Sequence, residues 1–305
     1  MSSDVDRTAI LLMAYGTPST ENEIESYLTD IRRGRKPSLD QVEDLKRRYR
    51  AIGGRSPLLE ITKAQAFELQ HALHANGIRR PVFYGMKHWH PYISETVREM
   101  CRLGVHSVVG LVLAPHYSRI SVGGYRDLLA AALADSKDVE IDFVESWYNN
   151  SLFQIALTER VINGLKSPHS TELSVIFTAH SLPERIIAEG DPYPAQLLES
   201  CKAVARRANI ERWAFAYQSA GRTGEKWLGP DILEVLGNMA TRSSVLVVPI
   251  GFVADHLEIL YDIDVEAKAF AKSRGIRLHR TESLNTSPKF ISALADIVST
   301  RLTLR

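Results

Sequence analysis

This sequence has two similar halves, and in each half apolar runs end in polar or ring-bearing residues. The run 8–13 (TAILLM) leads into AYGTP, and the run 173–178 (LSVIFT) leads into AHSLP. Longer runs at 108–114 and 245–249 end in the same way. In doubled α/β folds, ligands bind in a crevice at the carboxyl ends of the strands. We therefore expect one cleft lined by the polar residues that follow the strands: Tyr15, His88, His116, His180 and Glu258.

Short runs rich in β-branched residues alternate with longer helical patterns along the whole chain. Strands are predicted at 8–14, 81–86, 106–114, 139–144, 173–179, 212–217, 243–250 and 276–279. Helices are predicted at 61–75, 93–102, 125–133, 152–165, 194–208, 230–239 and 288–304. This alternation indicates parallel βαβ units with helices over both faces of the sheets. The predicted fold is α/β, with two Rossmann-like lobes that each hold a four-stranded parallel sheet flanked by helices.

The boundary between the lobes is expected in the polar stretch 166–170, which contains a proline. This gives an N-terminal lobe over residues 1–168 and a C-terminal lobe over 169–305. The terminal helix is expected to pack back on the first lobe. The long polar segment 19–55 follows the first strand, so it should lie over the mouth of the cleft.

Composition excludes several classes of protein. The chain has 305 residues, of which 45% are hydrophobic and 24% charged, as in ordinary soluble proteins. A net charge of +1 gives no field that would attract nucleic acid. No apolar run approaches the roughly 20 residues that span a bilayer, and the N-terminus lacks the apolar core of a signal peptide. Two cysteines are too few for an iron–sulfur cluster. We expect a cytoplasmic protein.

His180 and Tyr15 are the candidate reactive groups at the first strand end of each half. An imidazole ligates borderline metals and accepts a proton near neutral pH. The alternative is a structural histidine that caps its strand through a backbone hydrogen bond. The Tyr15 hydroxyl is a candidate weak ligand or proton carrier, and the alternative is a core aromatic residue.

Three acids follow the last long strand at intervals of four residues: Glu258, Asp262 and Glu266. In a helix this spacing places them on one face, where like charges repel by a few tenths of a kcal/mol per pair. Carboxylates in a row suit a hydrated divalent ion. The alternative is a solvated acidic helix face.

Two basic clusters, 32–36 and 46–50, lie in the polar segment after the first strand. Guanidinium groups bind carboxylates and phosphates in bidentate fashion, so the clusters suit an anion clamp. The alternative is a solvated loop. No Walker loop and no G-x-G-x-x-G follows a strand, which argues against a nucleotide cofactor.

A series of motifs carries a resemblance to a known family across nearly the whole chain. In order, they are LLMAYGTP, IRRGRKP, RYRAIGGRSPL, YGMKHWHP, VLAPHYS, ESWY, TAHSLPE, GDPYP, WLGPD and GFVADHLEILYD. Together they resemble the ferrochelatase family, and more narrowly the soluble coproporphyrin ferrochelatases of Gram-positive bacteria. The resemblance implies a chelatase-like fold and insertion of Fe²⁺ into coproporphyrin III, which gives coproheme in heme biosynthesis.

The same resemblance implies roles for individual residues. His180 matches the family's catalytic histidine, Glu258 the motif glutamate on the same side of the macrocycle, and Tyr15 the axial neighbour of iron on the opposite side. Positions that contact porphyrin substituents are matched by Arg32, Arg48, Tyr49, Ser56 and Tyr125. Asp262 and Glu266 match an outer acidic row that binds an accessory Mg²⁺. The chain departs from the family pattern at GGYRD around Tyr125 and at His90, where an acid is expected.

The basic mouth of the cleft favours the more anionic of two porphyrins. Coproporphyrin III carries four propionates and protoporphyrin IX two, so arginines such as Arg32 and Arg48 suit the first. The alternatives are a protoporphyrin IX ferrochelatase, another tetrapyrrole chelatase, or a heme- or metal-binding carrier. The expected partners are coproporphyrin III and Fe²⁺, bound by a monomer that makes transient contacts with neighbouring heme-pathway enzymes.

Overall fold

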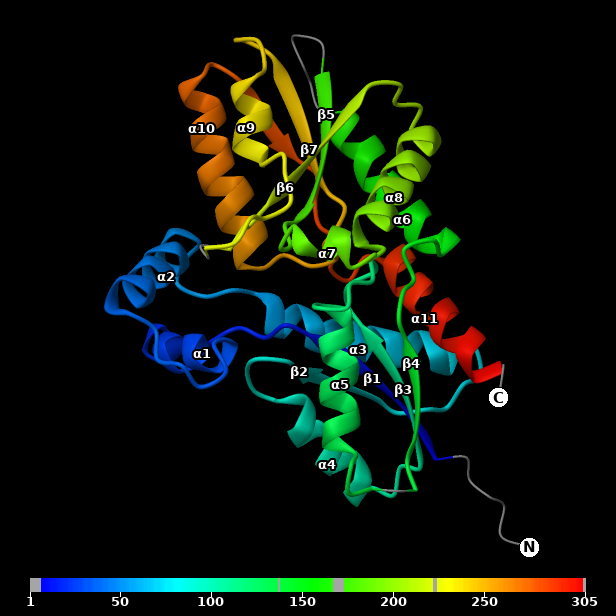
Figure 1. Cartoon of the computed structure of the whole chain (residues 1–305). Helices are drawn as coiled ribbons and strands as arrows, with labels where there is room; N and C mark the ends of the chain where they lie inside the picture. Colours follow the sequence, from blue (N-terminus) through cyan, green and yellow to red (C-terminus); the bar gives the residue numbers. More distant parts are fainter. Residues whose placement is uncertain (1–6, 137, 167–172, 222–223, 304–305) are drawn as a thin grey trace, which may run out of the picture.

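The computed structural model describes residues 7–136, 138–166, 173–221 and 224–303, which form two parallel sheets (Figure 1). The first sheet has the strand order β2-β1-β3-β4 and the second has β6-β5-β7-β8. The strands are β1 (Thr8–Ala14), β2 (Val82–Met86), β3 (Ser107–Val112), β4 (Glu140–Val144), β5 (Leu173–His180), β6 (Trp213–Gln218), β7 (Ser244–Pro249) and β8 (Arg277–Arg280). All eight predicted strands and the predicted fold of two Rossmann-like lobes are confirmed.

Helices follow the strands in both lobes. They are α1 (Ile24–Ile31), α2 (Leu39–Ala51), α3 (Leu58–Ala75), α4 (Ile93–Arg102), α5 (Val122–Ala132), α6 (Ser151–Leu165), α7 (Arg185–Ala188), α8 (Tyr193–Arg207), α9 (Ile232–Gly237), α10 (Lys268–Ser273) and α11 (Pro288–Thr303). Two further helical segments are the 3₁₀ helix η1 (Glu21–Glu23) and the π-helix η2 (Glu258–Ala267).

Strand β1 shows why the central strands are apolar throughout. All seven of its residues are buried, because its two faces point into different cores. Ile10 and Leu12 pack in the core that contains Leu69 of α3. Leu11, between them, packs in the core formed with α4 and α5. Successive side chains of a strand point to opposite faces, so a sheet covered on both sides needs an apolar residue at every position.

Helix α11 joins the two lobes. It packs against both α3, beside the first sheet, and α6, which lies beside the second (Figure 1). Its fully buried Phe290 belongs to one continuous core that includes Ile10 of β1 and Phe177 of β5. The predicted division of the chain at residue 168 lies outside the described residues, so it stays a prediction.

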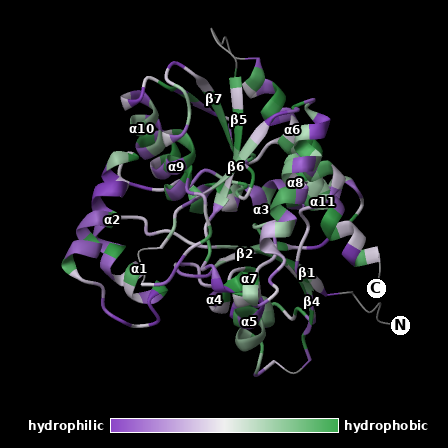
Figure 2. Ribbon diagram, turned by 45° about the horizontal axis from the view of Figure 1, so that its top comes forward, coloured by the Kyte–Doolittle hydropathy of each residue, from purple (hydrophilic) through white to green (hydrophobic). Residues whose placement is uncertain are grey.

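The polar segment that follows β1 forms η1, α1 and α2. A small core of Ile24, Val42 and Tyr49 holds these helices together, and Leu257 of the second lobe packs against it. The rest of α2 is mostly hydrophilic in Figure 2. Helix α2 also contacts η2, so this segment spans from the first lobe to the second.

The acidic helix of the second lobe differs in type from the ordinary helix that the sequence pattern suggests. Residues Glu258–Ala267 form a π-helix, in which backbone hydrogen bonds run from i to i+5. π-Helical turns are rare and occur frequently at functional sites.

Candidate active site

A cavity of about 640 Å³ lies between the lobes at the ends of their strands. Both sheets contribute to it: Tyr15 and His116 follow strands of the first sheet, and His180 and Gly251 follow strands of the second. The volume is within the range of about 300–1,000 Å³ that suits a drug-sized ligand. Of the five polar residues expected at the strand ends, all five line this cavity: Tyr15, His88, His116, His180 and Glu258.

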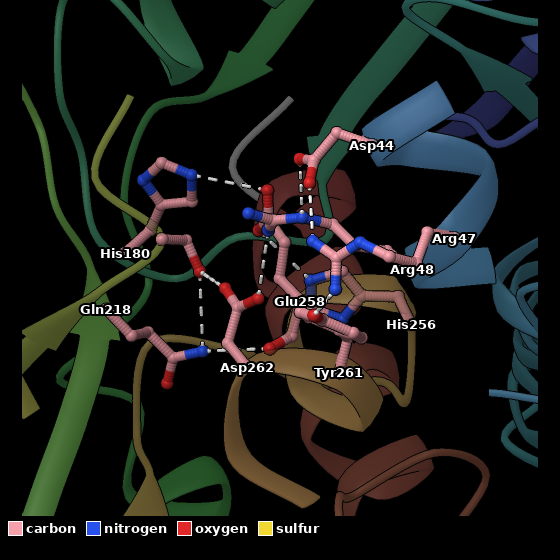
Figure 3. A network of polar contacts seen from close by, with 10 residues as sticks. Asp44, Arg47, Arg48, His180, Gln218, His256, Glu258, Tyr261 and Asp262 are labelled. Atoms are coloured by element: carbon pink, nitrogen blue, oxygen red, sulfur yellow. Dashed lines mark hydrogen bonds and ion pairs between the residues drawn. The ribbon is translucent and has the colours of Figure 1, made fainter. Parts of the chain in front are cut away.

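His180 and Glu258 form an ion pair at the cavity wall. The Nε2 atom of His180 lies 3.3 Å from Oε1 of Glu258, and about a third of each side chain is exposed (31% and 35%). Figure 3 shows the imidazole ring pointing toward the carboxylate. The other ring nitrogen, Nδ1, lies against the backbone carbonyl of Ser181. Both nitrogens therefore face acceptors, which favours the doubly protonated ring.

The charges of this pair stabilise one another. Burial disfavours the imidazolium, but the neighbouring Glu258 outweighs burial and raises the pKa of His180 to about 9. Burial likewise disfavours the charged carboxylate, but His180 and His256 together hold the pKa of Glu258 well below its usual range. At neutral pH the pair therefore carries one proton, on His180.

His256 is a member of this group that the sequence analysis did not select. Its Nε2 lies 3.4 Å from Oε2 of Glu258, so the carboxylate lies between two imidazoles. Its Nδ1 lies 3.0 Å from the carbonyl of Ala254. The signal in the sequence was its position two residues before Glu258, in the loop that follows β7.

The backbone around Glu258 is held from the adjacent strand. Gln218, at the end of β6, donates from Nε2 to the Glu258 carbonyl at 3.1 Å (Figure 3). Gln218 is fully buried, which fixes its position. The first turn of η2 is thus anchored to the sheet that also carries His180.

The outer acids do not line the cavity. Asp262 is buried, its carboxylate accepts from Ser219 Oγ, and Nη1 of Arg48 lies 3.4 Å away. Burial and the charge of Glu258 raise the pKa of Asp262 to about 6. Glu266 is exposed on the next turn. Over the described ranges, no three His, Cys, Asp or Glu side chains are grouped to hold a metal ion.

Arg48 faces this acid and not the cavity. Its Nε lies 3.1 Å from Asp44 on its own helix, and its guanidinium lies over the ring of Tyr261 at 5.0 Å. The neighbouring Arg47 donates to the Tyr261 hydroxyl at 2.8 Å. Arg48 is not among the residues that line the cavity, and its contacts fasten α2 to η2 (Figure 3). Its predicted contact with the porphyrin stays a prediction.

The first lobe supplies an aromatic wall. Tyr15 is 42% exposed and packs beside His88, with ring centroids 4.7 Å apart. Nδ1 of His88 lies 2.8 Å from Asp30. Although its side chain is exposed to the cavity, desolvation there and the nearby Glu258 raise the pKa of Tyr15 above its usual range. Three predicted substituent contacts also line the cavity: Tyr49, Ser56 and Tyr125.

The predicted basic contact Arg32 is not among the lining residues, and its neighbour Arg33 takes that place. Arg32 donates from Nε to the carbonyl of Arg35 within its own turn. Lys87, which directly follows β2, also lines the cavity and was not selected from the sequence. The structure thus gives the cavity two cationic side chains from the first lobe.

His116 lies deeper between the lobes. It is 2% exposed, and its Nε2 lies 2.8 Å from Ser200 Oγ of α8. Burial lowers the pKa of His116 to about 3, so this histidine is neutral. Its contact joins the end of β3 to the second lobe.

Solved structures of chelatases resemble this fold over most of the chain. The sirohydrochlorin chelatase SirB from Bacillus subtilis, determined with cobalt, matches with a TM-score of 0.56 over 96% of this chain and 94% of that chain. CbiX, described as the terminal enzyme of siroheme biosynthesis in denitrifying bacteria, also has a TM-score of 0.56 over 96% and 98%. Both are 11% identical to this chain, so the likeness concerns the fold alone, which is that of the chelatases.

Sequence comparison gives the family within this class. The ferrochelatase model matches residues 7–302, and the chain belongs to the ferrochelatase family. A ferrochelatase of Herpetosiphon aurantiacus is 44% identical over 96% of this chain and 98% of the relative. Coproporphyrin III ferrochelatases of Geobacillus kaustophilus and Geobacillus thermodenitrificans are 44% and 43% identical, over 97% and 96% of this chain and 97% and 95% of theirs. The predicted family and enzyme class, a metal chelatase, are confirmed.

Proposed function

We propose that this chain inserts Fe²⁺ into coproporphyrin III and releases Fe-coproporphyrin III. The observation that carries the proposal is the His180–Glu258 pair, 3.3 Å apart on the wall of the interlobe cavity that Tyr15 also lines. A porphyrin in this cavity has an imidazole and a carboxylate on one side and the Tyr15 hydroxyl on the other. The curated relatives named for coproporphyrin III support the choice of substrate.

Binding of the macrocycle supplies the energy that distorts it. A flat porphyrin keeps its nitrogen lone pairs in the ring plane, where a hydrated ion has poor access to them. Tilting one pyrrole turns a lone pair toward one face. Contacts to remote substituents, including Tyr49 and Ser56, hold the ring while the cavity walls impose this strain.

The His180–Glu258 pair removes the pyrrole N–H protons of the porphyrin. Two pyrrole N–H protons leave as the ion enters, so charge is conserved when Fe²⁺ replaces them. The pair first releases the proton on His180 to solvent, because a protonated ring has no lone pair for a pyrrole proton or for iron. The neutral ring then takes the pyrrole protons one at a time and passes each to solvent. The two groups act as one titrating unit. His256, 3.4 Å from the same carboxylate, gives that unit a second imidazole.

The choice between an enzyme and a carrier is tested by counting turnovers. Protein, coproporphyrin III and excess Fe²⁺ are mixed without oxygen, and formation of the metalloporphyrin is followed by absorbance. We expect many equivalents of product per protein. Conversion that stops at one equivalent would identify a carrier and overturn the proposal.

The choice of porphyrin is tested by comparing coproporphyrin III with protoporphyrin IX. We expect a higher kcat/KM for the substrate with four carboxylates, because Arg33 and Lys87 line the cavity. Equal values would contradict the preference and favour a protoporphyrin IX ferrochelatase. Arg33→Ala serves as the charge-removal variant, and we expect it to narrow the difference.

The proposal includes the setting of the reaction. No described helix is long and apolar enough to cross a membrane. We place the reaction in the cytoplasm, in a monomer that makes transient contacts with neighbouring heme-pathway enzymes. No iron–sulfur cluster takes part. An accessory Mg²⁺ at Asp262 and Glu266 stays a prediction: in this structure both Arg48 and Ser219 engage Asp262, and no step above uses the ion.

A further inference from the structure

Lys87 is an unusual cation in this molecule because it is largely buried and faces the cavity without an acidic partner. Within the described ranges its ammonium forms no ion pair with a carboxylate, and its close contact is the ring of Tyr125, 4.8 Å from Nζ to the centroid. Asp127 raises the pKa of Lys87 against the effect of burial, and its carboxylate lies 3.8 Å from Arg126. A buried cation without a counter-ion is costly unless a ligand supplies one.

Three other basic residues of the same region are already paired with acids. Arg50 lies 2.6 Å from Glu21, Lys36 lies 3.1 Å from Glu25, and Arg48 contacts two acids. Arg33 resembles Lys87 in two respects: it lines the cavity, and no ion pair joins it to an acid among the described residues. Burial, and then the charge of Arg33, lower the pKa of Lys87. Two unpaired cations therefore act on the same part of the cavity.

The position of Lys87 depends on a missing side chain. Gly124 lies in the first turn of α5, next to Tyr125, and a Cβ atom added there would come 2.9 Å from Lys87 Nζ. Apart from the residues adjacent to Gly124 and the backbone of its own helix, only Lys87 among the described residues has atoms within 4 Å of this Cβ position. A side chain at position 124 would therefore displace the ammonium from its present position.

We propose that Lys87 binds a carboxylate substituent of the macrocycle, and that Gly124 is a specificity-determining residue because it leaves the space in which the ammonium lies. This inference rests on the proposed function and names one subsite within it. A charged hydrogen bond forms there between Nζ and the carboxylate, in a site partly shielded from water. The bound anion also relieves the repulsion between Lys87 and Arg33.

The test uses two variants that remove the contact in different ways. Lys87→Met keeps the length of the side chain and removes its charge. Gly124→Ala keeps the charge and displaces it; the displaced atom is the end of a flexible side chain, and alanine is preferred to glycine in helices, so the fold is preserved. Gly123→Ala is the matched control, because its Cβ would meet no atom closer than 3.5 Å.

Porphyrin affinity is measured by fluorescence without metal, so the result does not depend on turnover. For coproporphyrin III we expect Kd to rise about tenfold in Lys87→Met and about threefold or more in Gly124→Ala. Gly123→Ala stays within about twofold of the wild type. The increase of Kd with added NaCl should be shallower in Lys87→Met, because one charge contact is lost.

Each result decides a defined part of the inference. An unchanged Kd and salt dependence in Lys87→Met would overturn the carboxylate contact. A loss in Lys87→Met with no change in Gly124→Ala would overturn the role of Gly124. If the wild type binds coproporphyrin III but does not metallate it, the proposed function fails while the affinity comparison still decides the subsite. Thermal melting of each variant verifies that it is folded.

Discussion

The protonation state of the His180–Glu258 pair is the residue-scale property on which the proposed reaction depends. The imidazolium is the resting form because the pKa of His180 is raised to about 9 by the adjacent carboxylate, against the effect of burial. In the proposed mechanism, metal insertion requires the neutral ring. The rate therefore depends on how easily this pair loses its proton.

The first prediction concerns Glu258→Gln. In the wild type, the neutral fraction of His180 rises about tenfold per pH unit below its pKa, so the insertion rate at saturating substrate should rise between pH 7 and 9. Without the carboxylate, burial lowers the pKa of His180 and is opposed only by the Ser181 carbonyl and Asp262, so we expect a pKa below that of the wild type. We expect the pH profile of the variant to be flatter above pH 7. Its rate at pH 9 should be lower, because no carboxylate stabilises the imidazolium that forms when His180 takes a pyrrole proton. NMR titration of the imidazole gives the pKa directly.

Glu68→Gln, on an exposed position of α3, is the control for loss of a carboxylate and should keep the wild-type profile. A rising profile up to pH 9 in Glu258→Gln, with an unchanged imidazole pKa, would contradict the electrostatic account of the pair.

At this scale the sequence predicted the central residues but not all of their neighbours. His180 and Glu258 follow strand ends, where side chains from different parts of the chain converge. Arg33 and Arg32 are adjacent, and the sequence pattern does not distinguish them. Arg33 adopts a left-handed conformation with φ of 55° in the turn after α1. Which of the two arginines faces the cavity depends on this turn geometry and not on composition.

At the scale of elements, the contact between α2 and η2 fastens the polar segment to the helix that carries Glu258. Arg48 is mostly buried against Asp262, with 22% and 6% of the two side chains exposed. The family resemblance suggested a substrate contact for Arg48, whereas the structure gives it a role in holding two elements together. These two roles predict different results.

The second prediction is that Arg48→Met lowers stability more than it weakens substrate binding. Removing the guanidinium leaves a buried carboxylate without its cation, which costs about 2 kcal/mol in the free energy of unfolding. Urea denaturation measures this loss, and we expect KM for the porphyrin to change by less than about threefold.

Arg50→Met is the matched control on the same helix. Its ion pair with Glu21 is exposed, with 57% and 34% of the side chains accessible, and such pairs contribute at most about 1 kcal/mol. Unchanged stability with a large rise in KM in Arg48→Met would instead support direct contact with the substrate.

The sequence did not predict that the acidic helix η2 is a π-helix. Acids four residues apart lie near one another in an ordinary helix, so the spacing of Glu258, Asp262 and Glu266 indicated a helix without defining its hydrogen bonding. Residues from outside η2 contact this π-helix, and one such contact is the hydrogen bond from Gln218 to the Glu258 carbonyl. Such tertiary contacts are not visible in a local pattern.

At the scale of the whole molecule, the two lobes share one core. Helix α11 contributes the fully buried Phe290, which belongs to the same core as residues of β1 and β5. The duplicated strand and helix order could be predicted from periodicity. The sequence also led us to expect that the terminal helix packs on the first lobe, where α11 contacts α3. Its contact with α6 could not be predicted, because an apolar helix face does not specify every element that covers it.

The third prediction is that Phe290→Ala destabilises both lobes together. Loss of a buried phenylalanine costs about 3–5 kcal/mol. Because the core is continuous, we expect one unfolding transition in calorimetry, shifted to lower temperature. Two separate transitions, with only one of them shifted, would contradict a single cooperative core.

The most direct measurement for the whole account is single-turnover metal insertion by His180→Ala, with porphyrin affinity determined in parallel. We expect insertion to fall by more than about 100-fold while Kd for coproporphyrin III stays within about threefold, because the imidazole acts on protons and metal and not on the substituents that anchor the ring. Insertion within about tenfold of the wild type, equivalent to about 1.4 kcal/mol in the barrier, would contradict the assignment of His180.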